Sequence, residues 1–157
     1  MTIFRFDSEH FSLLLRAEDG VACLRLIGEI DLDCEQVLTH TGAELGRLAP
    51  QRVLVDLAEV SFAGATLVNF LVRIVRAAPP TRSTVLCRPT RQTVRLLRIT
   101  STDSIAARSD HLPDAWLERH TTEGDGRPDR TVRALDAAPT LPRAPVFTTA
   151  REMGNSR

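Results

Sequence analysis

Few residues in this sequence combine a reactive type with a spacing that chemistry needs. Cys34 follows Asp31 by three residues and precedes His40 by six, so a thiol activated by a nearby base is one candidate. A cysteine in the first turn of a helix can also have a lowered pKa, which favours the thiolate. Cys34, however, falls on the apolar stripe of a predicted helix, where a small thiol packs in the core. We therefore expect no catalytic residue and no enzyme activity.

Metal and nucleotide motifs are missing from the sequence. The four histidines show neither HxxxH nor HExxH spacing, and the three cysteines include no CxxC pair, so they suggest neither a zinc site nor a disulfide framework. No glycine-rich phosphate loop of the GxGxxG or GxxxxGK type follows a predicted strand. We therefore expect neither a bound metal nor a cofactor.

The stretch VSFAGATLVNF, residues 60–70, is the feature that most suggests a site. It follows the apolar run at 53–57 and opens an apolar helix, a junction where small residues often serve a site. Within AGAT, residues 63–66, only Thr66 carries a hydroxyl. One interpretation is structural, because a threonine that caps a helix bonds a backbone N–H two or three residues further on.

The composition limits the kinds of partner. The sequence carries 20 basic and 20 acidic side chains, and all the basic ones are arginine. A nucleic-acid binder needs a concentrated positive surface, so we expect no nucleic-acid partner, with arginine contacts to DNA as the weaker alternative. No apolar stretch approaches the roughly 18 residues of a membrane helix, and the N-terminus does not resemble a signal peptide. We expect a cytoplasmic protein without direct membrane insertion.

Apolar periodicity predicts the elements that must position such a site. Two apolar runs, 11–16 and 21–27, flank an Asp-Gly turn and predict a hairpin. Further strands are expected at 52–57 and 83–88, with a short one at 105–107, and helices at 33–48, 64–77, 89–99 and 114–120. Pro89 is placed in the first turn of its helix. This order predicts an α/β fold, a small mixed β-sheet of four to five strands with helices packed on it.

The chain divides near residue 120. Residues 1–120 carry the periodic segments, whereas residues 121–157 are rich in proline, glycine, threonine and charge, with scattered apolar side chains. Such a segment cannot bury enough surface to offset the entropy lost on ordering. We expect one domain, 1–120, and a disordered C-terminal tail, 121–157.

Three segments of the predicted domain resemble the STAS domain, the fold of anti-sigma factor antagonists. A strand ends in Gly-Glu-Ile-Asp at 28–31, a second strand reads Val-Asp-Leu at 55–57, and a later helix reads VRLLRIT at 94–100. They occur in the family's order, and the resemblance covers residues 11–118. It implies a bacterial protein whose partner is an anti-sigma factor with a histidine-kinase-like ATPase fold. Sequestering that partner would free a sigma factor for transcription.

The resemblance also implies a switch, in which the partner phosphorylates a serine at the start of a helix. Aligned on Phe62, the family's aspartate falls on Gly64, the regulated serine on Ala65 and the next serine or threonine on Thr66. Ala65 cannot take a phosphate, so we expect that the phosphorylation site is lost. The alternatives are that Thr66 carries the switch, or that the partner surface has diverged.

By resemblance, the partner-binding surface is formed by the loops that follow two of the strands. Its candidate residues are Glu29, Asp31, Asp33, Ser61, Gly64, Ala65, Thr66 and Asn69. Some of these also have structural alternatives, because Asp31 or Asp33 can cap the helix at 33–48 and Asn69 can simply reach solvent. A basic stripe on the third helix is either a solvated face or a contact for an acidic partner, and it comprises Arg91, Arg95 and Arg98.

The sequence leaves other functions open. One is a STAS subunit of another assembly, either a stress-sensing complex or a lipid or anion transporter complex. Another is a small enzyme that uses Cys34 or the carboxylates, although the sequence supplies few convergent polar groups for it. A homodimer is also left open.

Overall fold

The computed structural model describes residues 1–117. The predicted tail, 121–157, and the last residues of the helix predicted at 114–120 lie outside the described residues. Among the residues described, no helix is long and apolar enough to cross a membrane.

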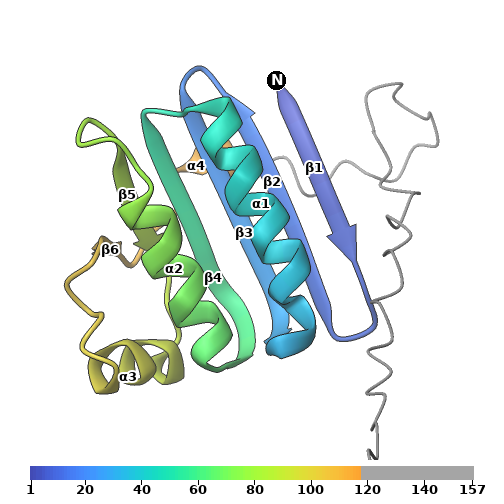
Figure 1. Ribbon diagram of the computed structural model, residues 1–157, viewed down its shortest axis with the longest axis vertical. Coiled ribbons are helices and arrows are strands. Elements are labelled where there is room, and N and C mark those ends of the chain that lie inside the picture. Colours follow the sequence, from blue (N-terminus) through green and yellow to red (C-terminus); the bar gives the residue numbers. More distant parts are fainter. Residues whose placement is uncertain (118–157) are drawn as a thin grey trace, which may run out of the picture.

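A single mixed sheet of six strands forms the centre of the molecule, with the strands side by side in chain order. β1 (Thr2–Asp7), β2 (Phe11–Glu18) and β3 (Val21–Ile30) are antiparallel neighbours. β4 (Arg52–Ala63), β5 (Ser83–Cys87) and β6 (Ala107–Ser109) continue the sheet in parallel with β3. The predicted mixed α/β architecture is confirmed, and Figure 1 shows the full row of strands.

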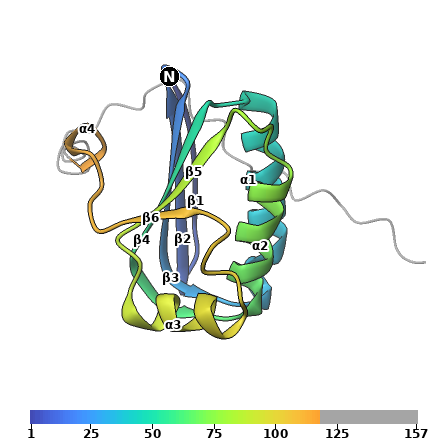
Figure 2. The ribbon, with the colours of Figure 1, turned by 90° about the vertical axis from the view of Figure 1, so that its left-hand side faces the viewer.

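The helices lie mainly on one face of the sheet. A 3₁₀ turn, η1 (Leu32–Cys34), leads into α1 (Glu35–Leu48), and α2 (Ala65–Arg76) lies beside α1. Figure 2, which views the sheet edge-on, shows α1 and α2 on one side and the short α4 (Asp114–Leu117) on the other. α3 (Arg91–Ile99) lies at the end of the sheet where β4 finishes. We call the face without α1 and α2 the open face.

The main core fills the space between the sheet and the helices α1 and α2. Fully buried side chains from the strands, such as Leu24 and Val55, meet Leu38 of α1 and Phe70 and Leu71 of α2. Each such side chain contributes about 1.5–3 kcal/mol by leaving water. A smaller cluster on the open face comprises Cys23, Leu54, Cys87 and Leu112. The central strands are therefore apolar on both faces, as their sequences predict.

The sheet has one strand more than the sequence predicted. β1 was not predicted, although the alternation of apolar and polar residues at 4–7 is typical of a half-buried strand. Its apolar side chains Phe4 and Phe6 nevertheless pack against the main core. β4 also runs to Ala63, well past the predicted end at residue 57, because β3 is irregular near Ile27 and stays paired with it.

Three boundaries also differ from the prediction. The last strand is β6 at Ala107–Ser109, not 105–107, because its pairing with β5 starts only at Ala107. Pro89 lies outside α3, since Thr90 is the N-cap and its hydroxyl accepts a hydrogen bond from the Thr93 amide at 3.2 Å. Asp31 caps η1, whereas α1 begins after Cys34 without a side-chain cap.

Gly28 is the position where the backbone most clearly requires glycine. Its φ is +92°, and a Cβ placed there would lie 2.2 Å from the carbonyl oxygen of His10. The Glu29 amide also donates to that carbonyl at 2.8 Å. The glycine of the Gly-Glu-Ile-Asp segment therefore lets β2 approach closely where β3 turns toward the candidate site.

Candidate functional site

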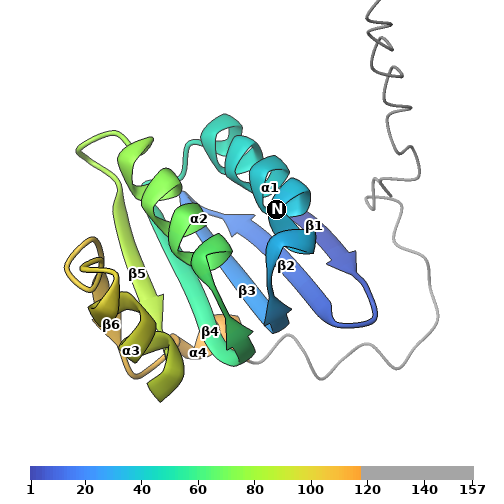
Figure 3. The same ribbon diagram turned by 60° about the horizontal axis from the view of Figure 1, so that its bottom comes forward.

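The candidate residues gather at one edge of the sheet, where β3 and β4 both end. The two strands are parallel, so their carboxyl ends meet there, and the register pairs Glu29 with Phe62 and Ile30 with Ala63. The Gly64 amide continues this pairing by donating to the Ile30 carbonyl at 3.3 Å. We call residues 29–33 and 61–69 the binding edge. Figure 3, turned toward this end of the molecule, shows the start of α2 beside the end of β3.

Asp31 has a structural role at the binding edge. Its carboxylate accepts a hydrogen bond from the Asp33 amide at 3.0 Å, which caps η1. The Asp31 carbonyl also accepts from the Cys34 amide at 3.2 Å. Asp31 is half-buried, whereas Glu29 and Asp33 are exposed. The turn therefore fixes the Asp31 carboxylate, while those of Glu29 and Asp33 face solvent.

No side chain caps the backbone amides in the first turn of α2. Gly64 is the N-cap and has no side chain, and no acidic residue lies in the first turn. The Leu67 amide donates to the Gly64 carbonyl at 3.2 Å, which leaves the amides of Ala65 and Thr66 without partners inside the helix. Together with the helix dipole, these amides make the position favourable for a negative charge.

Thr66 does not cap the helix. It is the second residue of α2 rather than its N-cap, and none of the hydrogen bonds among the described residues involves its hydroxyl. Its side chain is half-buried, whereas Ala65 beside it is exposed. The capping interpretation of Thr66 is therefore wrong. The exposed position at the helix start belongs to Ala65, a residue without a hydroxyl.

Two large apolar side chains at the binding edge are exposed. Leu32 in η1 is 72% exposed, and Phe62 near the end of β4 is 55% exposed. Phe62 lies beside the start of α2, because a Cβ added to Gly64 would be 3.8 Å from its ring. Both residues lie within the segments expected to contact a partner, but the sequence analysis did not single them out as contact residues. The available signal was Leu32 standing between two aspartates, outside any apolar stripe.

The outer face of α2 extends the binding edge. Ala65 and Asn69 are exposed one turn apart, and Arg73 follows one turn later. Arg73 donates from Nη1 to the Thr39 hydroxyl of α1 at 2.9 Å. Asn69 makes none of the hydrogen bonds found among the described residues, so its amide reaches solvent. Ser61 is likewise exposed, at the end of β4.

Cys34 is a core residue and not a nucleophile. It is 6% exposed, and burial raises the pKa of its thiol. Its Sγ lies 3.4 Å from the Glu29 carbonyl oxygen and 3.9 Å from the Asp31 carboxylate. These acceptors favour the protonated thiol. His40 lies elsewhere, with its ring 5.4 Å from that of Phe4, so the structure does not assemble a Cys-His pair with Cys34.

The predicted basic stripe lies on α3. Arg91, Arg95 and Arg98 are all exposed, and none of them makes an ion pair with another described residue. Ile99, at the end of the same helix, is 70% exposed. The stripe is therefore solvated within the described part of the chain.

Comparisons with known proteins identify the fold. No protein-family model matches the sequence, and no curated protein does so either. An anti-sigma factor antagonist from Mycobacterium paratuberculosis superposes with a TM-score of 0.60 at 20% identity, over 68% of this chain and 92% of that one. The unphosphorylated anti-sigma factor antagonist SpoIIAA gives 0.55 at 13% identity, over 68% and 94%.

A third solved structure is the phosphorylated form of SpoIIAA from Bacillus. It superposes with a TM-score of 0.53 at 13% identity, over 68% of this chain and 97% of that one. The matches cover nearly the whole length of these proteins, so the chain has the complete STAS fold that the sequence predicted.

Proposed function

We propose that this STAS-fold protein acts by binding, as an anti-sigma factor antagonist does. Its partner would be an anti-sigma factor with a histidine-kinase-like ATPase fold, held in the cytoplasm so that a sigma factor is free for transcription. The observation that carries the proposal is the pair of exposed apolar side chains, Leu32 and Phe62, beside the uncapped start of α2. The chain needs no chemistry of its own for this role.

The composition of the binding edge suits a protein partner. Apolar anchors surrounded by polar groups are typical of interface centres, where a few side chains carry most of the binding energy. Phe62 and Leu32 would be those anchors. Glu29, Asp31 and Asp33 would provide a polar rim that prefers basic groups on the partner.

We also propose that the usual phosphorylation switch is absent. Ala65 occupies the exposed first position of α2, and it has no hydroxyl. The one hydroxyl in that turn belongs to Thr66, which is half-buried and therefore less open to a kinase. A phosphate there would add about −1.5 to −2 charge to the contact surface. Without it, binding would be constitutive.

The proposal is tested by affinity capture from lysate of the native organism, with the full chain as bait. We expect an ATPase of the histidine-kinase-like fold, and direct titration should then confirm the complex. Phe62→Asp should weaken that complex by about 2 kcal/mol or more, because it places a charge at an apolar anchor.

The matched control is Ile3→Asp. Ile3 is also an exposed apolar residue, 44% exposed, but it lies on the edge strand β1, away from the binding edge. Its substitution should leave the affinity unchanged. Equal losses in the two variants, or capture of a membrane permease in place of the ATPase, would contradict the proposal. The second result would favour a transporter assembly.

A further inference from the structure

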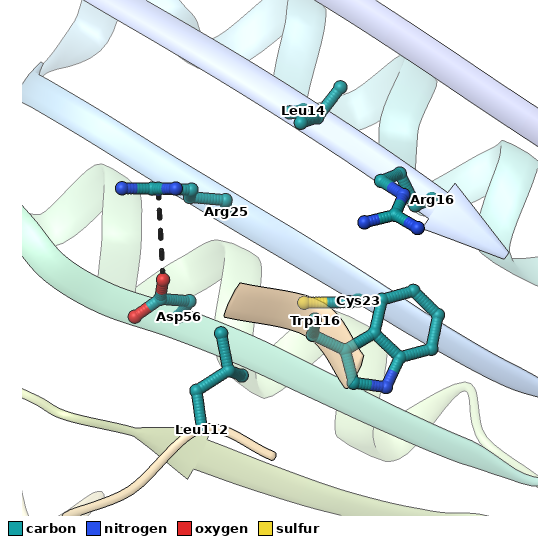
Figure 4. A pocket seen from close by; sticks show the side chains of 7 residues that line it. All are labelled: Leu14, Arg16, Cys23, Arg25, Asp56, Leu112 and Trp116. Carbon is teal, nitrogen blue, oxygen red and sulfur yellow. Dashed lines mark ion pairs between the residues drawn. The ribbon is translucent and has the colours of Figure 1, made fainter. Parts of the chain in front are cut away.

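A small hollow lies on the open face of the sheet, separate from the binding edge. Strands β2, β3 and β4 form its floor, and the segment that carries α4 forms one wall. Its lining residues are Leu14, Arg16, Cys23, Arg25, Asp56, Leu112 and Trp116. One side of the hollow is open to solvent. Figure 4 shows Arg16 beside the Trp116 ring and Arg25 facing Asp56.

The carboxylate of the hollow, that of Asp56, already accepts hydrogen bonds from its neighbours. Asp56 is 1% exposed, and Arg88 donates to both of its carboxylate oxygens, at 3.1 Å from Nε and 2.6 Å from Nη2. The Ala58 amide adds a third bond, at 3.3 Å. The Nε of Arg25 lies 3.8 Å from Asp56 Oδ2, beyond hydrogen-bond distance. Asp56 therefore has little capacity left for another cation.

Two donors in the hollow lack acceptors. Arg25 pairs through Nη2 with Glu59, but its buried Nε has no hydrogen-bond partner. Arg16 is 7% exposed and lies over the Trp116 ring, 5.0 Å from the ring centre. Among the described residues, no carboxylate lies within ion-pair distance of Arg16 and no atom accepts a hydrogen bond from it.

The local charges do not balance. Three guanidinium groups, those of Arg16, Arg25 and Arg88, share two carboxylates, Asp56 and Glu59. Among the described residues, Arg16 is therefore the one guanidinium of the hollow without a carboxylate, and its contact with Trp116 offsets only part of the cost of its burial. This unpaired positive charge favours an anionic ligand.

We propose that this hollow binds a small monocarboxylate. The planar guanidinium of Arg16 matches a carboxylate through two parallel hydrogen bonds. Arg25 adds positive charge but no direct contact, because its Nε is buried and faces Asp56. Leu14, Leu112 and Trp116 form apolar walls for a short hydrocarbon body. This site is independent of the function proposed for the binding edge, since it lies on the open face.

The chain carries its own reporter for this test. Trp116 is the only tryptophan, and the sequence contains no tyrosine. Butyrate is titrated into the full chain at constant pH and ionic strength while Trp116 emission is recorded. We expect a saturable change with butyrate and none with butyramide, which has the same shape without the charge. Bound butyrate should also raise the unfolding midpoint.

Variants assign the response to the hollow. Arg16→Gln should weaken butyrate binding at least about tenfold, because the charged guanidinium that pairs with the carboxylate is lost. Arg95→Gln, which removes an exposed arginine of α3, should leave it unchanged. If Arg16→Gln does not fold, as circular dichroism would report, Arg16→Lys takes its place. Lysine keeps the positive charge but lacks the paired donors of the planar guanidinium, so weaker but measurable binding is expected.

Several results would overturn the assignment. They are a response that butyramide reproduces, a response that Arg16→Gln or Arg16→Lys leaves intact, and no saturable response at all. A second titration uses the end-blocked tripeptide Ala-Glu-Ala, which presents a carboxylate from a polypeptide. Binding of the tripeptide without binding of butyrate would assign the hollow to a protein side chain and reject the small-molecule ligand.

Discussion

At the scale of single residues, the start of α2 combines an exposed alanine with a backbone that favours negative charge. Ala65 is exposed at the first position of the helix, next to backbone amides that favour negative charge. Gly64 has φ −116° and ψ −160°, an extended conformation that any residue adopts. A Cβ there would meet the Phe62 ring at 3.8 Å, an ordinary contact. The backbone therefore still fits the residues that the resemblance led us to expect.

The double substitution Gly64→Asp with Ala65→Ser should restore a phosphorylation site. We expect the captured ATPase, with ATP, to place one phosphate on the double variant and none on the wild type, as measured by intact mass. Phosphate on wild-type Thr66 would show instead that the switch has moved by one residue. Thr66→Val in the double variant is the control, and it should leave the added phosphate unchanged.

At the scale of elements, the sequence predicted the strands and helices whose apolar pattern is strong. The helices at 33–48 and 64–77 are found as η1 with α1 and as α2, because their apolar stripes face the main core. Periodicity offered only the four alternating residues 4–7 as a signal for β1, and the structure adds the pairing of that edge strand with β2. Periodicity could not predict the extension of β4, which depends on pairing with β3.

The proximity of residues 29–33 and 61–69 could be predicted from the family resemblance, and the structure brings these segments together where the parallel strands β3 and β4 end. The exposure of Phe62 and Leu32 could not, since an apolar residue on a strand or turn is normally expected inside. The hollow on the open face also escaped prediction. Its residues come from three strands and the segment that carries α4, and only the sheet register brings Arg16, Arg25 and Asp56 together.

The glycines of β3 and α1 give a prediction about element stability. Gly28→Ala should destabilise the fold by roughly 2 kcal/mol or more, because φ is +92° and the new methyl would meet the His10 carbonyl at 2.2 Å. Gly46 is the matched control. It lies in α1 with no atom within 4 Å of a Cβ, so Gly46→Ala should stabilise by about 0.5–1 kcal/mol. Urea unfolding measures both, and changes of the same sign would contradict the geometry at Gly28.

At the scale of the whole molecule, the buried thiols should make stability fall in alkali. Burial raises the pKa of Cys23 from 9.0 to about 12 and that of Cys87 from 9.0 to about 11. In the unfolded chain these thiols lose their protons near pH 9, whereas the folded chain keeps them protonated. Their stabilising effect is therefore complete below about pH 9 and is lost as the pH rises toward 11 and 12.

The measurement is urea unfolding at about pH 8 and about pH 10.5, where we expect a loss on the order of 2 kcal/mol for each of the two thiols. The chain has no lysine and no tyrosine, so few other side chains titrate in this window. Cys23→Ala should reduce the difference between the two pH values. A difference that stays the same in Cys23→Ala and in Cys87→Ala would show that other groups cause it.

The order of the strands has a consequence for how the protein is made. Each strand of the sheet lies beside the strand that precedes it in the chain, from β1 to β6. During synthesis the N-terminal hairpin can therefore form first, and every later strand adds to a free edge as it leaves the ribosome. No strand must wait for a distant segment, and none must be inserted between two that are already paired. The sheet can grow in one direction at the pace of translation.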